Sequence, residues 1–226
     1  MDELEAIERA LLAAAAPPLV MVGFNRRFSP AARAVKAFVE QRPGPLTVSI
    51  RFNALAVPPD HWTHDAEQGG GRIIGEACHA FDLATFLTGS LPVRVYAEAA
   101  SGGPGAAERD DQCFVTLRHA NGSVSNIAYL AGGDRAFPKE RVEAIGGGAV
   151  AVIEDFRQAA GYAGGKRRVL WAGSRDKGHA AAIAAFADAV GGGSAWPIPW
   201  PELRATALGC ILAVRSLREG VPFDIA

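Results

Sequence analysis

The chain has 226 residues, of which 49% are hydrophobic, so it is long and apolar enough to bury a substantial core. Its 23 Lys and Arg residues nearly balance its 24 Asp and Glu residues, and no block of like charge occurs. This balance excludes the electrostatic pattern of a nucleic-acid or membrane-surface binder and favours a small-molecule partner. The three cysteines are far apart and form no CxxC pair, which favours a reducing cytoplasm over a disulfide framework.

The N-terminal segment has the pattern of a helix, a strand and a second helix. Apolar residues recur at helical spacing over 2–15, and Pro17-Pro18 should end that helix. The apolar run 19–22 has the pattern of a short buried strand. Ser29 supplies an N-cap and Pro30 a first helical residue for a helix to about residue 41. These elements are half of an α/β layer without its other strands.

The rest of the chain changes character, because short β-type runs joined by glycine turns become frequent. The turns 120–122 and 146–148 are too short for a parallel crossover, so they predict antiparallel pairing. Helices are expected over about 70–88, 177–190 and 201–220, and the glycine-rich segment Ser101–Ala107 is expected to be a flexible loop. The predicted strands cover residues 46–54, 93–99, 112–119, 123–130, 140–145, 149–156 and 166–171.

The predicted fold class is therefore α+β: an open, mostly antiparallel sheet with helices on one face, preceded by a residual α/β piece. An open sheet with one bare face needs a cover, which predicts a homo-oligomer, as a dimer formed through the sheet. Alternating apolar residues are expected to supply that surface, namely Val115, Leu117, Val142 and Val152.

The densest polar cluster is DHWTHDAEQGGGRIIGEACHAFD, residues 60–82, with three of the five histidines. Its glycines precede a helix and offer close backbone approach and free amides to a ligand. Glu76 and His79 are three residues apart, as are His79 and Asp82, so both pairs are expected to share a helix face. The apolar residues around them leave open the alternative that His79 is a buried, purely structural histidine.

A metal site is a rival interpretation of this cluster. His61, His64, Asp65 and Glu67 could join the Glu76-x-x-His79 pair as ligands. A di-metal site of that kind needs the motif twice, and it occurs once, so no metal ligand is assigned. Trp62 and His64 suit a substrate-facing rim at least as well.

Three segments resemble the glucose-fructose oxidoreductase and inositol dehydrogenase family (Gfo/Idh/MocA). Residues 22–30, VGFNRRFSP, are similar to its link between the last Rossmann strand and the following helix. Residues 69–82, GGGRIIGEACHAFD, resemble its sheet-domain signature, in which glycines lead into the helix with the catalytic histidine. Residues 214–222, VRSLREGVP, resemble its C-terminal helix and tail.

The resemblance implies a dehydrogenase of a sugar, polyol or related secondary alcohol that uses NAD or NADP. His79 would accept the proton of the hydroxyl, a task that suits an imidazole because its pKa is near neutrality. Residues 1–42 would be the end of a nucleotide-binding Rossmann domain and residues 43–226 the substrate-binding domain. The glycine-rich turn and the Glu-Lys-Pro motif of that nucleotide domain are not found, so activity is expected to need that domain in cis or in trans.

The sequence also departs from the family pattern. Gly75 stands where the family usually has an aspartate, and Glu76 follows one residue later, about 100° around a helix. Glu76 is therefore either a substitute catalytic contact or a partner of a neighbouring loop. The predicted substrate-binding residues are Trp62, His64, Arg72, Arg135 and Lys139, and the predicted cofactor-binding residues are Asn25 and Arg27. The alternative for Arg27 is that it only ties two elements together. The alternative for Arg135 and Lys139 is that they lie in a solvated loop.

Three functions remain open on this sequence. The first is the oxidoreductase half described above. The second is a non-catalytic oligomerisation or ligand-binding module without a nucleotide domain. The third is a metal-dependent hydrolase or isomerase, which bound zinc, manganese or iron would reveal.

Overall fold

The computed structural model describes residues 2–58, 60–65, 68–100, 111–192 and 195–225. The expected loop Ser101–Ala107 and the metal-ligand candidate Glu67 lie outside these residues. Within them, strands β1 to β9 form one sheet in the order β8-β7-β6-β5-β1-β4-β3-β2-β9. All neighbouring pairs are antiparallel except β1 and β4, which are parallel. The predicted α+β class with an open, mostly antiparallel sheet is confirmed.

The strands agree closely with the sequence pattern. Seven of the predicted strands form, and two further strands, β7 and β9, were not predicted. The turn between β5 and β6 consists of Gly147 and Gly148, both with positive φ (55° and 73°), as a two-residue hairpin requires. The strands are β1 (Thr47–Asn53), β2 (Pro92–Ala99), β3 (Gln112–His119), β4 (Val124–Leu130), β5 (Glu140–Gly146), β6 (Ala149–Glu154), β7 (Gln158–Ala163), β8 (Lys166–Ala172) and β9 (Phe223–Asp224).

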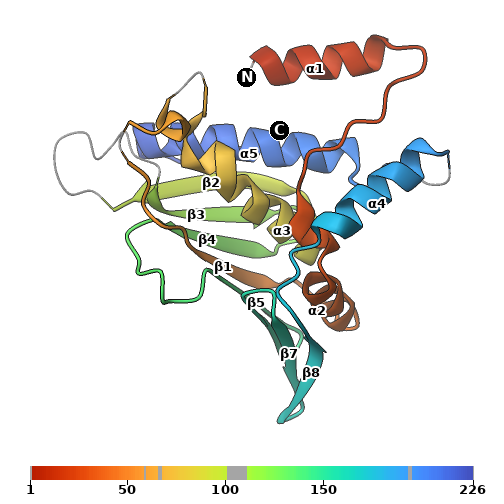
Figure 1. The fold of residues 1–226 in the computed structure, drawn as a ribbon, viewed down its shortest axis with the longest axis vertical. Coiled ribbons are helices and arrows are strands. Elements are labelled where there is room, and N and C mark those ends of the chain that lie inside the picture. The colour runs from red at the N-terminus through yellow and green to blue at the C-terminus, as the bar shows by residue number, and fades with distance from the viewer. Residues whose placement is uncertain (1, 59, 66–67, 101–110, 193–194, 226) are drawn as a thin grey trace.

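Helices cover one face of this sheet (Figure 1). Helix α2 (Pro30–Glu40) packs on β6, β7 and β8, whereas α3 (Cys78–Thr88) packs on β1 and β4 and α5 (Trp200–Glu219) on β2. The N-cap of α2 is as expected, since the Ser29 hydroxyl accepts a hydrogen bond from the amide of Ala32 at 3.0 Å. Helices α1 (Asp2–Ala13) and α4 (His179–Val190) lie farther from the sheet. No helix in the described part of the chain is long and apolar enough to cross a bilayer.

The other face of the sheet is bare among the described residues, and β3 alternates strictly between exposed and buried positions. The prediction of which apolar residues lie on this face was wrong for three of the four positions. Val115, Leu117 and Val142 are buried on the helix-covered face, and only Val152, which is itself 9% exposed, lies on the opposite face. Counting alternate apolar residues identified the strands but not which side each faces. The exposed apolar residues of the bare face are Phe114, Val124, Ile145, Tyr162 and Val169.

The strand expected over residues 19–22 does not form, and this prediction was wrong. The segment has no regular structure, and Val22 is exposed. A parallel buried strand is stable only between strand neighbours, and no described strand pairs with this segment. It leads instead into the 3₁₀-helix η1 (Asn25–Phe28), whose four residues are all buried.

Candidate active site

The central element of the candidate site is a helix that begins with π-helical geometry and continues with α-helical geometry. The π-helical segment η3 (Ile73–Ala77) continues directly into α3, so Glu76 lies in the π segment and His79 in the first α-turn. A π segment inserts an extra residue per turn and turns side chains away from α-helical spacing; such bulges are frequent at functional sites. Glu76 and His79 consequently have different neighbours and no hydrogen bond with each other. The expected shared face assumed α-helical spacing, and a common role for the two residues stays a prediction.

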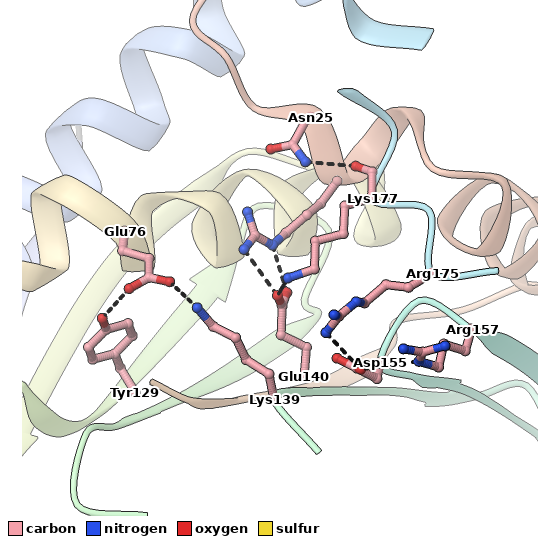
Figure 2. A network of polar contacts seen from close by, with 10 residues as sticks. Asn25, Glu76, Tyr129, Lys139, Glu140, Asp155, Arg157, Arg175 and Lys177 are labelled. Carbon is pink, nitrogen blue, oxygen red and sulfur yellow. Dashed lines mark hydrogen bonds and ion pairs between the residues drawn. The ribbon is translucent and has the colours of Figure 1, made fainter. Parts of the chain in front are cut away.

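Glu76 is the centre of a charged cluster (Figure 2). Its carboxylate accepts hydrogen bonds from the Lys139 ammonium at 2.7 Å, the Tyr129 hydroxyl at 2.5 Å and the Arg72 guanidinium at 3.0 Å. Burial alone would raise the pKa of Glu76, but the hydrogen bonds from Lys139 and Tyr129 and the charges of Lys139 and Arg72 lower it to about 2. Glu76 is therefore ionised at neutral pH and is a weak base.

His79 is placed differently. Its ring lies edge-on to the ring of Phe24, with 5.9 Å between the centroids. Its Nδ1 atom is buried and has no hydrogen-bond partner among the described residues. Burial, and then the nearby charge of Arg26, lower the pKa of His79 to about 4. The imidazole is thus neutral at physiological pH, and its one ring contact among the described residues is with the apolar ring of Phe24.

A second ion cluster lies beside His79 and was not predicted. The buried Glu140 accepts hydrogen bonds from Arg26 at 2.7 and 3.2 Å and forms a further ion pair with Lys177 (Figure 2). Burial opposes ionisation of Glu140, but Arg26 and Lys177 overcome it and hold its pKa below the usual range. The sequence contains a signal for this cluster. Glu140 lies two residues before the inward-facing Val142 and therefore points to the same side of β5. A charged side chain at an inward position needs a partner.

The two predicted cofactor-binding residues are engaged within the chain. The Arg27 guanidinium binds the fully buried carboxylate of Asp82 at 2.6 to 3.1 Å and Glu202 at 2.7 Å. The side-chain amide of Asn25 donates to the carbonyl of Lys177 at 2.7 Å. These contacts tie η1 to α3, α5 and the segment before α4. A role in cofactor binding stays a prediction for both residues.

The predicted substrate-binding residues fall into two groups. Arg72 and Lys139 meet at Glu76, and Arg135 shares a pocket wall with Lys139. Trp62 and His64 lie in a separate 3₁₀-helix, η2 (Trp62–His64), where Trp62 is 58% exposed and stacks against His61 at 5.7 Å. No described contact joins η2 side chains to the Glu76 cluster. Among the residues that the structure describes, no three His, Cys, Asp or Glu side chains are grouped as metal ligands.

The chain was compared with known protein families and with solved structures. Residues 44–147 match the family described as the GFO/IDH/MocA C-terminal domain. An inositol 2-dehydrogenase from Rhizobium meliloti (strain 1021) is 37% identical over 114 residues, which is 48% of this chain and 34% of that protein. The chain spans about a third of the length of the curated relatives that it matches.

Two solved structures have the same fold. An aldose-aldose oxidoreductase from Caulobacter crescentus, complexed with glycerol, superimposes with a TM-score of 0.77 at 20% identity, covering 99% of this chain and 68% of that one. A levoglucosan dehydrogenase in complex with NADH gives a TM-score of 0.79 at 20% identity, covering 100% and 70%. Residues 44–147 therefore match the C-terminal domain of the GFO/IDH/MocA family, and the sheet with its helices on one face has the fold of these two oxidoreductases.

Proposed function

We propose that the chain is the substrate-binding part of an NAD- or NADP-dependent oxidoreductase that acts on a sugar, a polyol or a related secondary alcohol. The observation that carries the proposal is His79, a neutral imidazole with an unpaired nitrogen at the start of a helix interrupted by a π segment. The inositol 2-dehydrogenase and the levoglucosan dehydrogenase among the similar proteins support this substrate class.

In this function His79 accepts the proton of the substrate hydroxyl. A general base must be in its unprotonated form and within hydrogen-bond reach of the proton that it takes, and the unprotonated form of histidine is the neutral imidazole. The lowered pKa keeps His79 in the neutral form across the physiological range. Glu76 does not serve as the base, because its pKa of about 2 makes it weaker still. Its role is to hold Lys139 and Arg72 in place as donors for other substrate oxygens.

The two residues expected to bind the cofactor already have partners within the chain. Arg27 is buried and bonded to two carboxylates, and the amide of Asn25 is used by Lys177. The resemblance to the family, and the NADH bound to the levoglucosan dehydrogenase, support a nicotinamide ring as the hydride acceptor. That ring would be supplied by a nucleotide-binding domain in cis or in trans.

Helix α4 offers a surface for such a domain. Ile183, Phe186 and Val190 lie at i, i+3 and i+7 on one side of α4, and Ile183 is 71% exposed. A row of exposed apolar residues of this kind marks a docking surface. The opposite side of α4 packs on η1, the segment that resembles the link to a nucleotide domain.

The proposal is tested by joining the chain to the nucleotide-binding domain of a relative. The fusion to that domain of the Rhizobium meliloti inositol 2-dehydrogenase is assayed with inositol, aldoses and glycerol, each with NAD and NADP, by the absorbance of reduced nicotinamide. The chain alone is the control and should be inactive. A folded fusion that turns over none of these alcohols, under conditions in which the intact relative is active, would refute the proposal.

A further inference from the structure

A pocket of about 540 Å³ opens beside the Glu76 cluster, at the end of strand β1. Its walls are the end of β1, the loop 131–139, the turn between β6 and β7, and Arg175. Its size is that of a small-molecule site, typically about 300–1,000 Å³. Lys139 lines this pocket and also donates to Glu76, so the pocket adjoins the candidate active site.

The pocket has an excess of positive charge. Its carboxylates are only Glu154 and Asp155, and Glu154 is paired with Arg141, which lies outside the lining. Lys139 is likewise neutralised from outside, by Glu76. Arg135 has no hydrogen bond or ion pair with any residue that the structure describes. The cationic side chains that line the pocket are Arg135, Lys139, Arg157 and Arg175.

Asp155 is shared between two of these arginines (Figure 2). Its Oδ2 atom lies 3.7 Å from Arg157 and 3.3 Å from Arg175. The side chain of Asp155 is 14% exposed, whereas those of Arg157 and Arg175 are 58% and 46% exposed. Each guanidinium has five N–H donors in a planar fork, so one distant carboxylate oxygen leaves most of them unused. Both arginines can therefore donate to an added oxyanion.

The walls that carry these arginines are held in place. Asp155 and Phe156 both have positive φ (45° and 53°), and the ring of Phe156 is fully buried. The amide of Asp155 donates to the carbonyl of Glu140 at 2.7 Å, and the carbonyl of Phe156 accepts from the amide of Asp176 at 3.1 Å. Gly173 donates to the carbonyl of Arg157 at 3.0 Å. A turn fixed in this way reduces the ordering cost of binding.

We propose that this arginine pocket, formed by Arg135, Arg157 and Arg175 around Asp155, binds the oxyanion of a small molecule, either a carboxylate or a phosphate monoester. The proposal does not rest on the proposed dehydrogenase function. Binding is measured on this chain alone, without turnover, so the failure of one proposal leaves the other standing.

The test titrates three probes into the full chain at low ionic strength, with binding followed by calorimetry. Gluconate carries a carboxylate, glucose 6-phosphate carries a phosphate, and glucose is the uncharged control. One or both charged probes should bind at least about tenfold more tightly than glucose, the effect of one charge-assisted hydrogen bond. The tighter of the two identifies the oxyanion. If neither binds more tightly than glucose, the proposal is wrong.

Two kinds of variant should change the affinity for the charged probe in opposite directions. Arg135→Gln and Arg175→Gln should each weaken binding of the charged probe by about tenfold, whereas Arg218→Gln removes an exposed charge on α5 and should not. Asp155→Asn should tighten binding, because it releases both arginines, and Asn tolerates the left-handed backbone of Asp155. Arg135 has no partner to lose, so its variant keeps the fold. Equal affinity of Arg135→Gln, Arg175→Gln and the parent would overturn the proposal.

Discussion

Replacing His79 by Ala should separate activity from stability. The imidazole makes an edge contact with Phe24, worth about 0.5–1.5 kcal/mol. Its Nδ1 atom is buried without a partner, which costs the folded state about 1–3 kcal/mol. These two effects offset each other, so His79→Ala should change the free energy of unfolding by no more than about 1 kcal/mol. Loss of a positioned base should lower turnover of the fusion enzyme by about 10²- to 10⁴-fold.

His119 provides the matched control. It is 1% exposed, and its ring nitrogens lie 2.8 Å from the Ser90 carbonyl oxygen and 2.8 Å from the Ser125 hydroxyl. His119→Ala leaves both partners without their hydrogen bond and should cost about 2–5 kcal/mol. Turnover per folded molecule should not change in this variant.

The measurements are urea unfolding of the chain and turnover of the fusion enzyme, made on both variants. The expected result is a crossed pattern: turnover falls only in His79→Ala and stability only in His119→Ala. A His79→Ala variant that is destabilised by more than about 2 kcal/mol but keeps full turnover per folded molecule would show a structural histidine. The base would then lie elsewhere.

Four further predictions follow from described contacts. Arg27→Ala should destabilise the chain by about 3–5 kcal/mol in urea unfolding, because the buried Asp82 loses its partner; a loss below about 1 kcal/mol would contradict this. The stability of the parent relative to His79→Ala should fall as the pH drops from 6.5 towards 4, because folding lowers the pKa of His79 from 6.5 to about 4 and the unfolded state therefore takes up more protons; the comparison with the variant is needed because burial raises the pKa of Asp82 to about 6, which acts in the opposite sense, and a pH-independent difference would argue against a buried neutral ring. Calorimetry should detect no micromolar binding of NAD or NADP to the chain alone. The chain should form a dimer through the bare face, and Phe114→Lys should make it monomeric in light scattering, whereas the same change at the exposed Ile183 should not.

Local patterns in the sequence predicted most of the fold, and the failures have physical causes. Strand β7 was missed because its sequence, QAAGYA, has little β propensity. Its small residues are needed because α2 packs directly on it: a Cβ on Gly161 would lie 2.7 Å from the ring of Phe38. The apolar run 19–22 was wrongly predicted as a strand because periodicity cannot show whether neighbouring strands exist.

The candidate site was predictable in its helix but not in its partners. The motif around residues 69–82 located Glu76 and His79, whose spacing was interpreted as α-helical. The π segment, which changes their directions, has no recognisable signal in that motif. The Glu140 cluster joins residues 114 positions apart, from η1 and β5, and no local pattern links such residues. The sequence therefore does not single out Arg26 or Lys177, although it singles out the adjacent Arg27.

The position of strand β1 has a consequence for how the chain folds. The antiparallel meanders β2-β3-β4 and β5-β6-β7-β8 each consist of strands that are consecutive in the sequence, so each can form locally. β1 lies between them, pairing Thr47 with Val124 on one side and with Ile145 on the other. Both pairings span long stretches of chain, so they carry a loop-closure cost and should form late. A proline at the buried Ile50 should then leave two separately ordered meanders, visible as two transitions in hydrogen exchange where the parent shows one.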